Sequence, residues 1–267
     1  MRLSIGKKPK TLLNLHTLKS TSDNDIYREL IRAVKNLSLK RFPQVIDPLL
    51  RNPRVQKALP CFGNTIESMS IAKHFTLPSL DRLLEFYKLI IFSQSSEINE
   101  FIMMRERFET LIVNNDIKLC ETLLIEFKET HGESFWWIKA KLILLFYKQN
   151  ADEMQDFCDE VKLRSEKGIF TYYMNSLVLS TQASFPASNL KKIVVKAVEE
   201  LDKAKLSHAA WLLDILFFPK ILSSRDDELH NLHALTQLPL IDMYSMLTSV
   251  LYSFVSNYNS SSESKKF

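Results

Sequence analysis

The residue types best suited to chemistry lie in the segment RDDELHNLH, which spans residues 225–233. Arg225 is followed at once by Asp226 and, five residues later, by His230. An arginine can stabilise the charge of a phosphate through paired N–H donors, and a histidine can move a proton near neutral pH. These residue types at this spacing therefore suit chemistry on a phosphate group.

The spacing Arg225-Asp226-x3-His230 resembles the signature of the HEPN ribonucleases, an all-helical family. The resemblance implies metal-independent cleavage of RNA, usually across a dimer, with Arg225, Asp226 and His230 as the site. The same segment also reads as an ordinary capping turn, in which Asp226 and Asp227 begin a helix and His230 points into solvent. We favour the capping turn and keep the ribonuclease as an alternative function.

Other arrangements that could carry chemistry are incomplete. His230 and His233 lie three residues apart and could hold a metal with Asp226, but zinc sites want three or four well-placed ligands and no further His or Cys lies nearby. Nothing in the sequence brings Cys61 and His74 together as a nucleophile and base. Only 4 of 267 residues are glycine, and neither GxGxxG nor GxxxxGK[ST] occurs, which argues against Rossmann and P-loop enzymes. We expect no cofactor and no bound metal.

Charge is unevenly placed along the chain. Residues 1–60 hold 13 Lys and Arg against 4 Asp and Glu, and the remainder is acidic, so that the whole chain has a net charge of +4. Arg28, Arg32 and Lys35 fall on one helical face, and Lys40 and Arg41 follow. Such a basic face can neutralise phosphates, so nucleic acid is a possible partner through residues 1–60. Docking on the acidic part of the same chain is the alternative.

The segment HGESFWWIKAKLILLFYKQN, residues 131–150, holds an almost unbroken apolar run. It is no membrane span, because Lys139, Lys141 and Lys148 interrupt it and a span needs about 20 predominantly apolar residues. A helix that is apolar nearly all round is covered on several sides. Trp136 and Trp137 could line a groove or stack on bases, and helical spacing places at least one of them in the core.

Helical periodicity dominates the rest of the chain, and strand signals are scarce. Residues 116–132 place apolar side chains on one helical face, with Asp116 as a candidate cap and Gly132 in a left-handed position at the end. Residues 151–168 begin with Asp152 and Gln155 at capping-box spacing. Further helices are expected at 79–94, 96–115, 134–148, 169–182, 188–205, 207–222 and 239–258.

Two successive helical hairpins match at an offset of 36 residues. Gly132 meets Gly168, the Trp136–Trp137 pair meets Tyr172–Tyr173, and Ala140 meets Ser176. This resembles tetratricopeptide-type repeats, best over residues 116–183 and loosely over 79–114 and 188–218. The resemblance implies a TPR-like α-solenoid, in which each second helix is packed on several sides.

The first 75 residues differ from this pattern. Pro43, Pro48 and Pro53 are spaced by five residues, which suggests short helices begun by proline, after a helix at 25–37. We therefore expect a basic, proline-punctuated segment at 1–75, a helical-hairpin domain at 76–258 and a disordered polar tail at 259–267.

The sequence as a whole predicts an all-α protein made of stacked antiparallel helical hairpins. Three unpatterned cysteines and the lack of a secretory signal or membrane span predict a cytoplasmic location. The favoured function is a non-enzymatic scaffold or adaptor that binds another protein along its curved surface. The alternatives are the ribonuclease that uses Arg225 and His230, and a nucleic-acid-binding accessory subunit.

Overall fold

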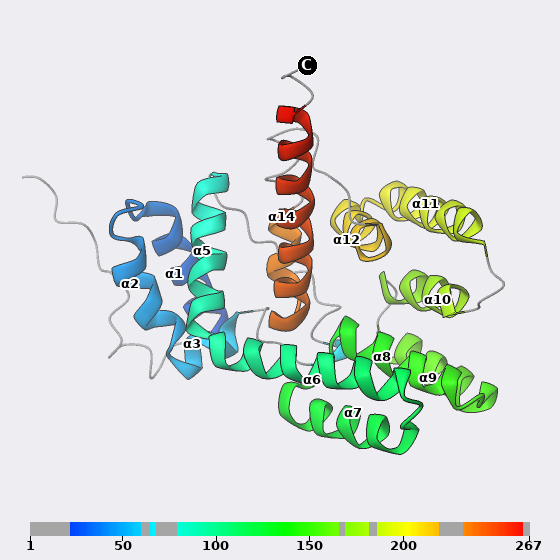
Figure 1. The fold of residues 1–267 in the computed structure, drawn as a ribbon. Coiled ribbons are helices and arrows are strands. Elements are labelled where there is room, and N and C mark those ends of the chain that lie inside the picture. Colours follow the sequence, from blue (N-terminus) through cyan, green and yellow to red (C-terminus); the bar gives the residue numbers. More distant parts are fainter. Residues whose placement is uncertain are drawn as a thin grey trace, which may run out of the picture.

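The computed structural model describes residues 22–59, 65–67, 79–165, 169–181, 186–218 and 232–263. Every element within these ranges is a helix, which confirms the all-α expectation (Figure 1). The elements are α1 (Asp23–Asn36), α2 (Phe42–Leu50), α3 (Pro53–Ala58), α5 (Leu80–Ser93), α6 (Ser95–Val113), α7 (Ile117–His131), α8 (Phe135–Tyr147), α9 (Ala151–Arg164), α10 (Ile169–Thr181), α11 (Ala187–Lys203), α12 (Ser207–Phe217), the 3-10 helix η3 (His233–Gln237) and α14 (Leu240–Glu263).

The N-terminal helices follow the proline pattern only in part. Pro43 and Pro53 lie in the first turns of α2 and α3, where a missing N–H costs nothing. Pro48 was expected to begin a third short helix, but it lies inside α2. The helix tolerates this because Pro48 and Gln44, whose carbonyl loses its partner, are both exposed, so that water can replace the bond.

The caps expected for two central helices also differ from the sequence pattern. Asp116 precedes α7 but its side chain accepts no capping hydrogen bond. Helix α9 is capped by Asn150, whose side chain accepts from the backbone N–H of Glu153, and not by Asp152. Gly132 does take a positive φ, 76°, as expected for the residue that ends α7.

Helices α6 to α12 pack as a row of consecutive neighbours, each against the next in sequence. Alternate helices also touch, because α10 contacts both α8 and α12. We call the side formed by these three touching helices the inner side of the row. Helix α14 lies against α6, α8 and η3.

Helix α8 is covered as its composition predicts. It contacts α7, α9, α10 and α14, and most of its side chains are buried. Within the described ranges, we find no helix with both the length and the apolar character that a membrane crossing requires.

One hydrophobic core connects the two ends of the described chain. Buried apolar side chains from Ile26 in α1 to Val250 in α14 belong to a single cluster. Helix α2 packs on α5, and Arg82 at the start of α5 donates to the carbonyl oxygens of Val34 and Leu37 at the end of α1. The core thus runs across the boundary expected near residue 76, which itself lies outside the described residues. At the other end α14 continues to Glu263, inside the segment expected to be a polar tail.

Candidate functional site

The residues of the ribonuclease signature cannot be placed. Arg225, Asp226 and His230 lie outside the described residues, as do Cys61 and His74. His233 is buried in η3. Within the described ranges, no group of three His, Cys, Asp or Glu side chains could hold a metal ion. Catalysis at residues 225–230 therefore stays a prediction from the sequence.

The basic residues of α1 lie on its solvent side, opposite the buried Ile26, Leu30 and Val34. Arg28 lies 3.8 Å from Asp25, and Arg32 pairs with Glu29, one turn earlier in each case. Lys35, Lys40 and Arg41 are exposed and form no ion pair within the described part of the chain. Exposed pairs of this kind contribute little stability, so the arginines remain free to exchange partners.

The two tryptophans lie in different surroundings, because side chains of neighbouring residues in a helix point about 100° apart. Trp136 packs into an aromatic cluster, with ring centroids 5.4 Å from Phe101, 5.9 Å from Phe108 and 4.7 Å from Phe127. Trp137 lies on another side of α8, edge-on to Phe157 of α9 at 5.8 Å. Trp136 is half-buried against the core and Trp137 is 7% exposed within it, and of the pair only Trp137 lines the groove between α7 and α8.

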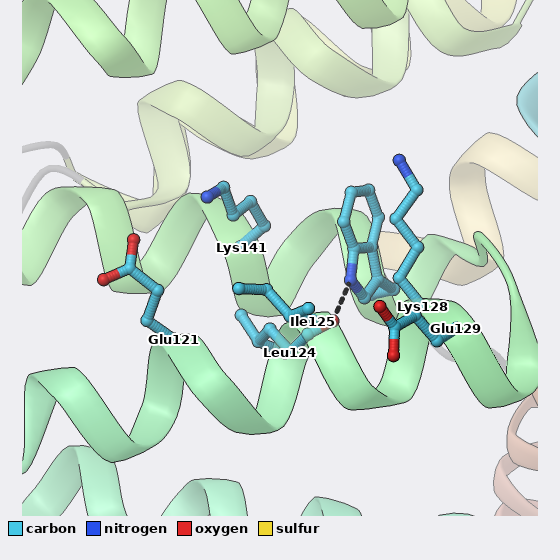
Figure 2. Close-up of a pocket in the computed structure, with 7 residues that line it drawn as sticks. Glu121, Leu124, Ile125, Lys128, Glu129 and Lys141 are labelled. Carbon is cyan, nitrogen blue, oxygen red and sulfur yellow. Dashed lines mark hydrogen bonds between the residues drawn. The ribbon is translucent and has the colours of Figure 1, made fainter.

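A groove of about 410 Å³ runs between α7 and α8, and we call it the α7–α8 groove (Figure 2). Its lining comprises Glu121, Leu124, Ile125, Lys128, Glu129, Trp137 and Lys141. The indole N–H of Trp137 donates to the carbonyl oxygen of Leu124 at 3.0 Å, which fixes the ring and satisfies its only polar group. Ile125 is 57% exposed although it is apolar. The floor is thus a rigid apolar surface with one aliphatic side chain open to solvent.

Charges of both signs surround this floor. Lys128 lies over the Trp137 ring at 4.9 Å and pairs with Glu133 at 2.9 Å. Lys148 bridges Glu121 at 3.3 Å and Glu153 at 3.2 Å, and these hydrogen bonds raise its pKa. Figure 2 shows Glu121 and Lys141 on one side of the apolar centre and Lys128 and Glu129 on the other, so that both signs are present at each end. A rim of mixed sign suits a polypeptide better than a ligand of uniform charge.

An ion cluster around the buried Glu133 ties the segment 65–67 to α9. Arg164 donates to Glu133 at 2.7 and 2.8 Å and to Glu67 at 2.7 and 3.1 Å. The Ile66 N–H donates to Glu133 at 3.0 Å, and the Ile66 side chain is fully buried. Burial alone would raise the pKa of Glu133, but the bonds from Arg164, Lys128 and Ile66 outweigh it and lower the pKa. The sequence did not predict this cluster, because Glu133 appears there only as a single acidic residue that precedes an apolar run.

Helix α14 meets the inner side of the row through a buried carboxylate. Asp242 accepts hydrogen bonds from the backbone N–H groups of Phe135 at 2.7 Å and Trp136 at 3.0 Å, the first two residues of α8. Burial raises the pKa of Asp242 to about 7. Side chains of α8, α10, α12 and α14 line a small cavity of about 220 Å³ around it, and the exposed Lys139 and Ser249 lie at its edge. A lone acid in the apolar run of residues 238–250 was the only sequence signal.

Two cysteines lie within the described residues, and neither has the surroundings of a reactive thiolate. Cys120 and Cys158 are buried, and burial raises the pKa of both thiols, which disfavours the reactive thiolate. The chain matches no protein-family model, no curated protein and no solved structure. The candidate sites for binding a partner are the α7–α8 groove and the exposed basic residues Arg28, Arg32, Lys35, Lys40 and Arg41.

Proposed function

We propose that this protein is a non-enzymatic interaction scaffold of the cytoplasm, and that a partner protein docks in the α7–α8 groove. The observation that carries the proposal is the exposed Ile125 beside Leu124 and the fixed Trp137 ring, within a rim of both charges. Interfaces commonly combine a small apolar centre containing an aromatic ring with a polar rim.

The TPR-like α-solenoid expected from the sequence supports this role, since stacked hairpins present extended surfaces. The pattern of buried and exposed side chains is the same in α8 and in α10 when the two helices are aligned at the offset of 36 residues. Over residues 136–140 of α8 and 172–176 of α10 the order is half-buried, buried, buried, exposed and buried. The small residues Ala140 and Ser176 are both buried, in helices that touch. This agreement supports a repeated hairpin unit.

The partner surface proposed here is not the inner side of the row. Side chains of α14 line the same cavity as those of α8, α10 and α12, and Asp242 holds α14 to the first turn of α8. The chain's own last helix thus occupies the side on which a curved array would receive a ligand. No residue of α14 lines the α7–α8 groove, and this favours it as the docking site.

The test is purification from native cells at low salt, with wild-type chain and two variants. Ile125→Glu puts a charge on the apolar centre of the groove at a position exposed enough to leave the fold intact. We expect a protein partner at fixed ratio with wild type, lost with Ile125→Glu. The matched control is Leu163→Glu on α9, where the original side chain is 87% exposed and lines no part of the groove. Equal recovery of the partner with both variants would remove the groove from the proposal.

A nucleic-acid-binding accessory subunit is the second candidate, favoured by the unpaired Lys35, Lys40 and Arg41. Residues 22–59 hold eight Lys or Arg against four Asp or Glu. The measurement is binding of a single-stranded RNA probe against salt concentration. Binding through these residues should weaken steeply with salt, and their triple alanine variant should show a shallower slope. Binding that does not depend on salt would exclude this candidate. The same probe tests the ribonuclease alternative, whose cleavage His230→Ala should abolish.

A further inference from the structure

A second groove, of about 630 Å³, lies where the turns at one end of the hairpin row come together, and we call it the turn groove. It runs from the turn after α6, past the end of α8 and the start of α9, to the last residue of α10. Its lining comprises Asn115, Leu145, Phe146, Tyr147, Gln149, Asn150, Ala151, Met154 and Thr181. Three successive hairpins therefore contribute to one surface.

This lining contains no charged side chain, although 25% of the chain's residues are charged. The aromatic side chains are open to solvent: Phe146 is 41% exposed and Tyr147 is 48% exposed, and their rings meet edge-on at 6.1 Å. A neutral, aromatic surface of this kind offers apolar contact, and it provides no opposite charge to compensate a charged ligand for the loss of its hydration. Charge complementarity therefore selects an uncharged occupant.

Side-chain amides supply the polar part of the groove. Asn115 and Gln149 have no side-chain hydrogen bond within the described residues, whereas Asn150 is occupied as the cap of α9. Each free amide carries both a donor and an acceptor, which matches the N–H and C=O of an extended peptide backbone. Apolar ligands without such groups would leave both amides unused.

The two free amides are held in equivalent turns, 34 residues apart. Asn115 and Gln149 both adopt a left-handed backbone, with φ of 60° and 54°. In each case the next N–H reaches back to close the helix end, from Asp116 to Leu111 at 2.9 Å and from Asn150 to Leu145 at 3.4 Å. This closed turn fixes the backbone, and with it the direction of the Cα–Cβ bond, at each of the two positions. Left-handed non-glycine residues carry a conformational cost, so the surrounding structure must impose them.

We propose that the turn groove binds an uncharged, extended peptide segment of a partner protein, with a large apolar side chain against Phe146 and Tyr147 and its backbone held by Asn115 and Gln149. The proposal rests on the scaffold role and names a second contact on it.

The experiment uses the full chain as bait for a displayed library of random ten-residue peptides, followed by measurement of Kd for the most enriched peptide. We expect enriched peptides that lack Asp, Glu, Lys and Arg and share one large apolar residue. The double variant Asn115→Gly with Gln149→Gly keeps the left-handed turns and removes both amides. It should raise the Kd of that peptide at least tenfold.

Lys205→Gly is the matched control, because Lys205 is also left-handed, with φ of 60°, but lies outside the turn groove. It should leave Kd within twofold of wild type. Three results would overturn the proposal: no enrichment over an unrelated bait, a charged residue at a fixed position in the selected peptides, or an unchanged Kd in the double variant. The purification with Ile125→Glu is independent of these results. A partner lost there while the library selection fails would leave the scaffold role standing and remove only the turn groove.

Discussion

Glu133 and Asp242 are both buried carboxylates, and their pKa values move in opposite directions because their neighbours differ. Glu133 has Arg164 and Lys128 within salt-bridge distance, so its charged form is compensated. Asp242 has two backbone N–H donors and no cation in the described contacts, so burial dominates and its pKa rises to about 7. Each group therefore makes its own prediction about stability.

Replacing Arg164 should destabilise the protein strongly. Arg164→Leu leaves Glu133 buried with only Lys128 as a cation and removes the ion pair with Glu67 that ties the segment 65–67 to α9. Removing one partner of a buried pair costs about 3–5 kcal/mol. Urea unfolding at pH 7 measures the loss. Lys162→Leu on the same helix is the control, because its contact with Asp159 is long, at 3.9 Å, and should be worth at most about 0.5 kcal/mol. A similar loss in both variants would mean that the buried cluster is not special.

Asp242 should make stability fall as pH rises. Its folded pKa of about 7 lies above the ordinary 3.8, so between these values the folded chain binds more protons than the unfolded chain. The stability is fully present below the unfolded pKa and is lost as pH rises through the folded pKa. The span corresponds to roughly 4 kcal/mol at most. Thermal unfolding from pH 4 to 8 should show wild type losing stability relative to Asp242→Asn, and parallel curves would contradict the assignment.

Helix α8 shows how one element is built from local and distant groups. Ser134 caps it locally, accepting from the N–H of Trp137, and Asp242 of α14 accepts from the two preceding N–H groups. Gly132 then turns the chain from α7 into α8 with φ of 76° and ψ of −156°, a region essentially restricted to glycine. The start of α8, which bears both tryptophans, therefore depends on Gly132 and on the carboxylate of Asp242 from the distant helix α14.

Substitution of Gly132 tests this junction. Gly132→Ala introduces a Cβ where the backbone is accessible only to glycine, and it should reduce the free energy of unfolding by about 1–3 kcal/mol. Gln149→Gly, at a left-handed position, is the control and should leave stability unchanged or raise it by about 1 kcal/mol. Both are measured by urea unfolding. An unaffected Gly132→Ala would show that the junction tolerates another backbone geometry.

Across the described residues, helices α6 to α12 pack in sequence order, and the last helix, α14, lies against α6, α8 and η3 (Figure 1). Side chains of α14 line the cavity around Asp242 together with those of α8, α10 and α12. The groove proposed for the partner and the turn groove lie away from α14, since neither is lined by its residues. The surface that α14 covers is therefore separate from the two grooves that we propose as binding sites.

Removal of α14 should expose the inner side and cause self-association. A chain ending at Leu238 leaves Phe135, Tyr173, Ile215 and Leu216 without their cover from α14. Exposed apolar surface of this extent promotes aggregation. Light scattering and binding of a hydrophobic dye measure the effect, and Tyr252→Ala, at a side chain 78% exposed, serves as the control. A truncated chain that stays monomeric and binds no dye would mean that α14 is dispensable to the fold.

The all-helical class, the burial of at least one tryptophan and the positive φ of Gly132 were predictable from the sequence, because helical period and glycine geometry are properties of a few neighbouring residues. Cap identity was less accessible, since Asn150 rather than Asp152 caps α9. Only the tertiary structure decided that Arg164 meets Glu67, 97 residues away, and that Asp242 caps α8 from 107 residues away. Such pairs form only when packed helices bring the two residues together. The periodicity of neighbouring residues in the sequence does not indicate which distant charged residue will be the partner.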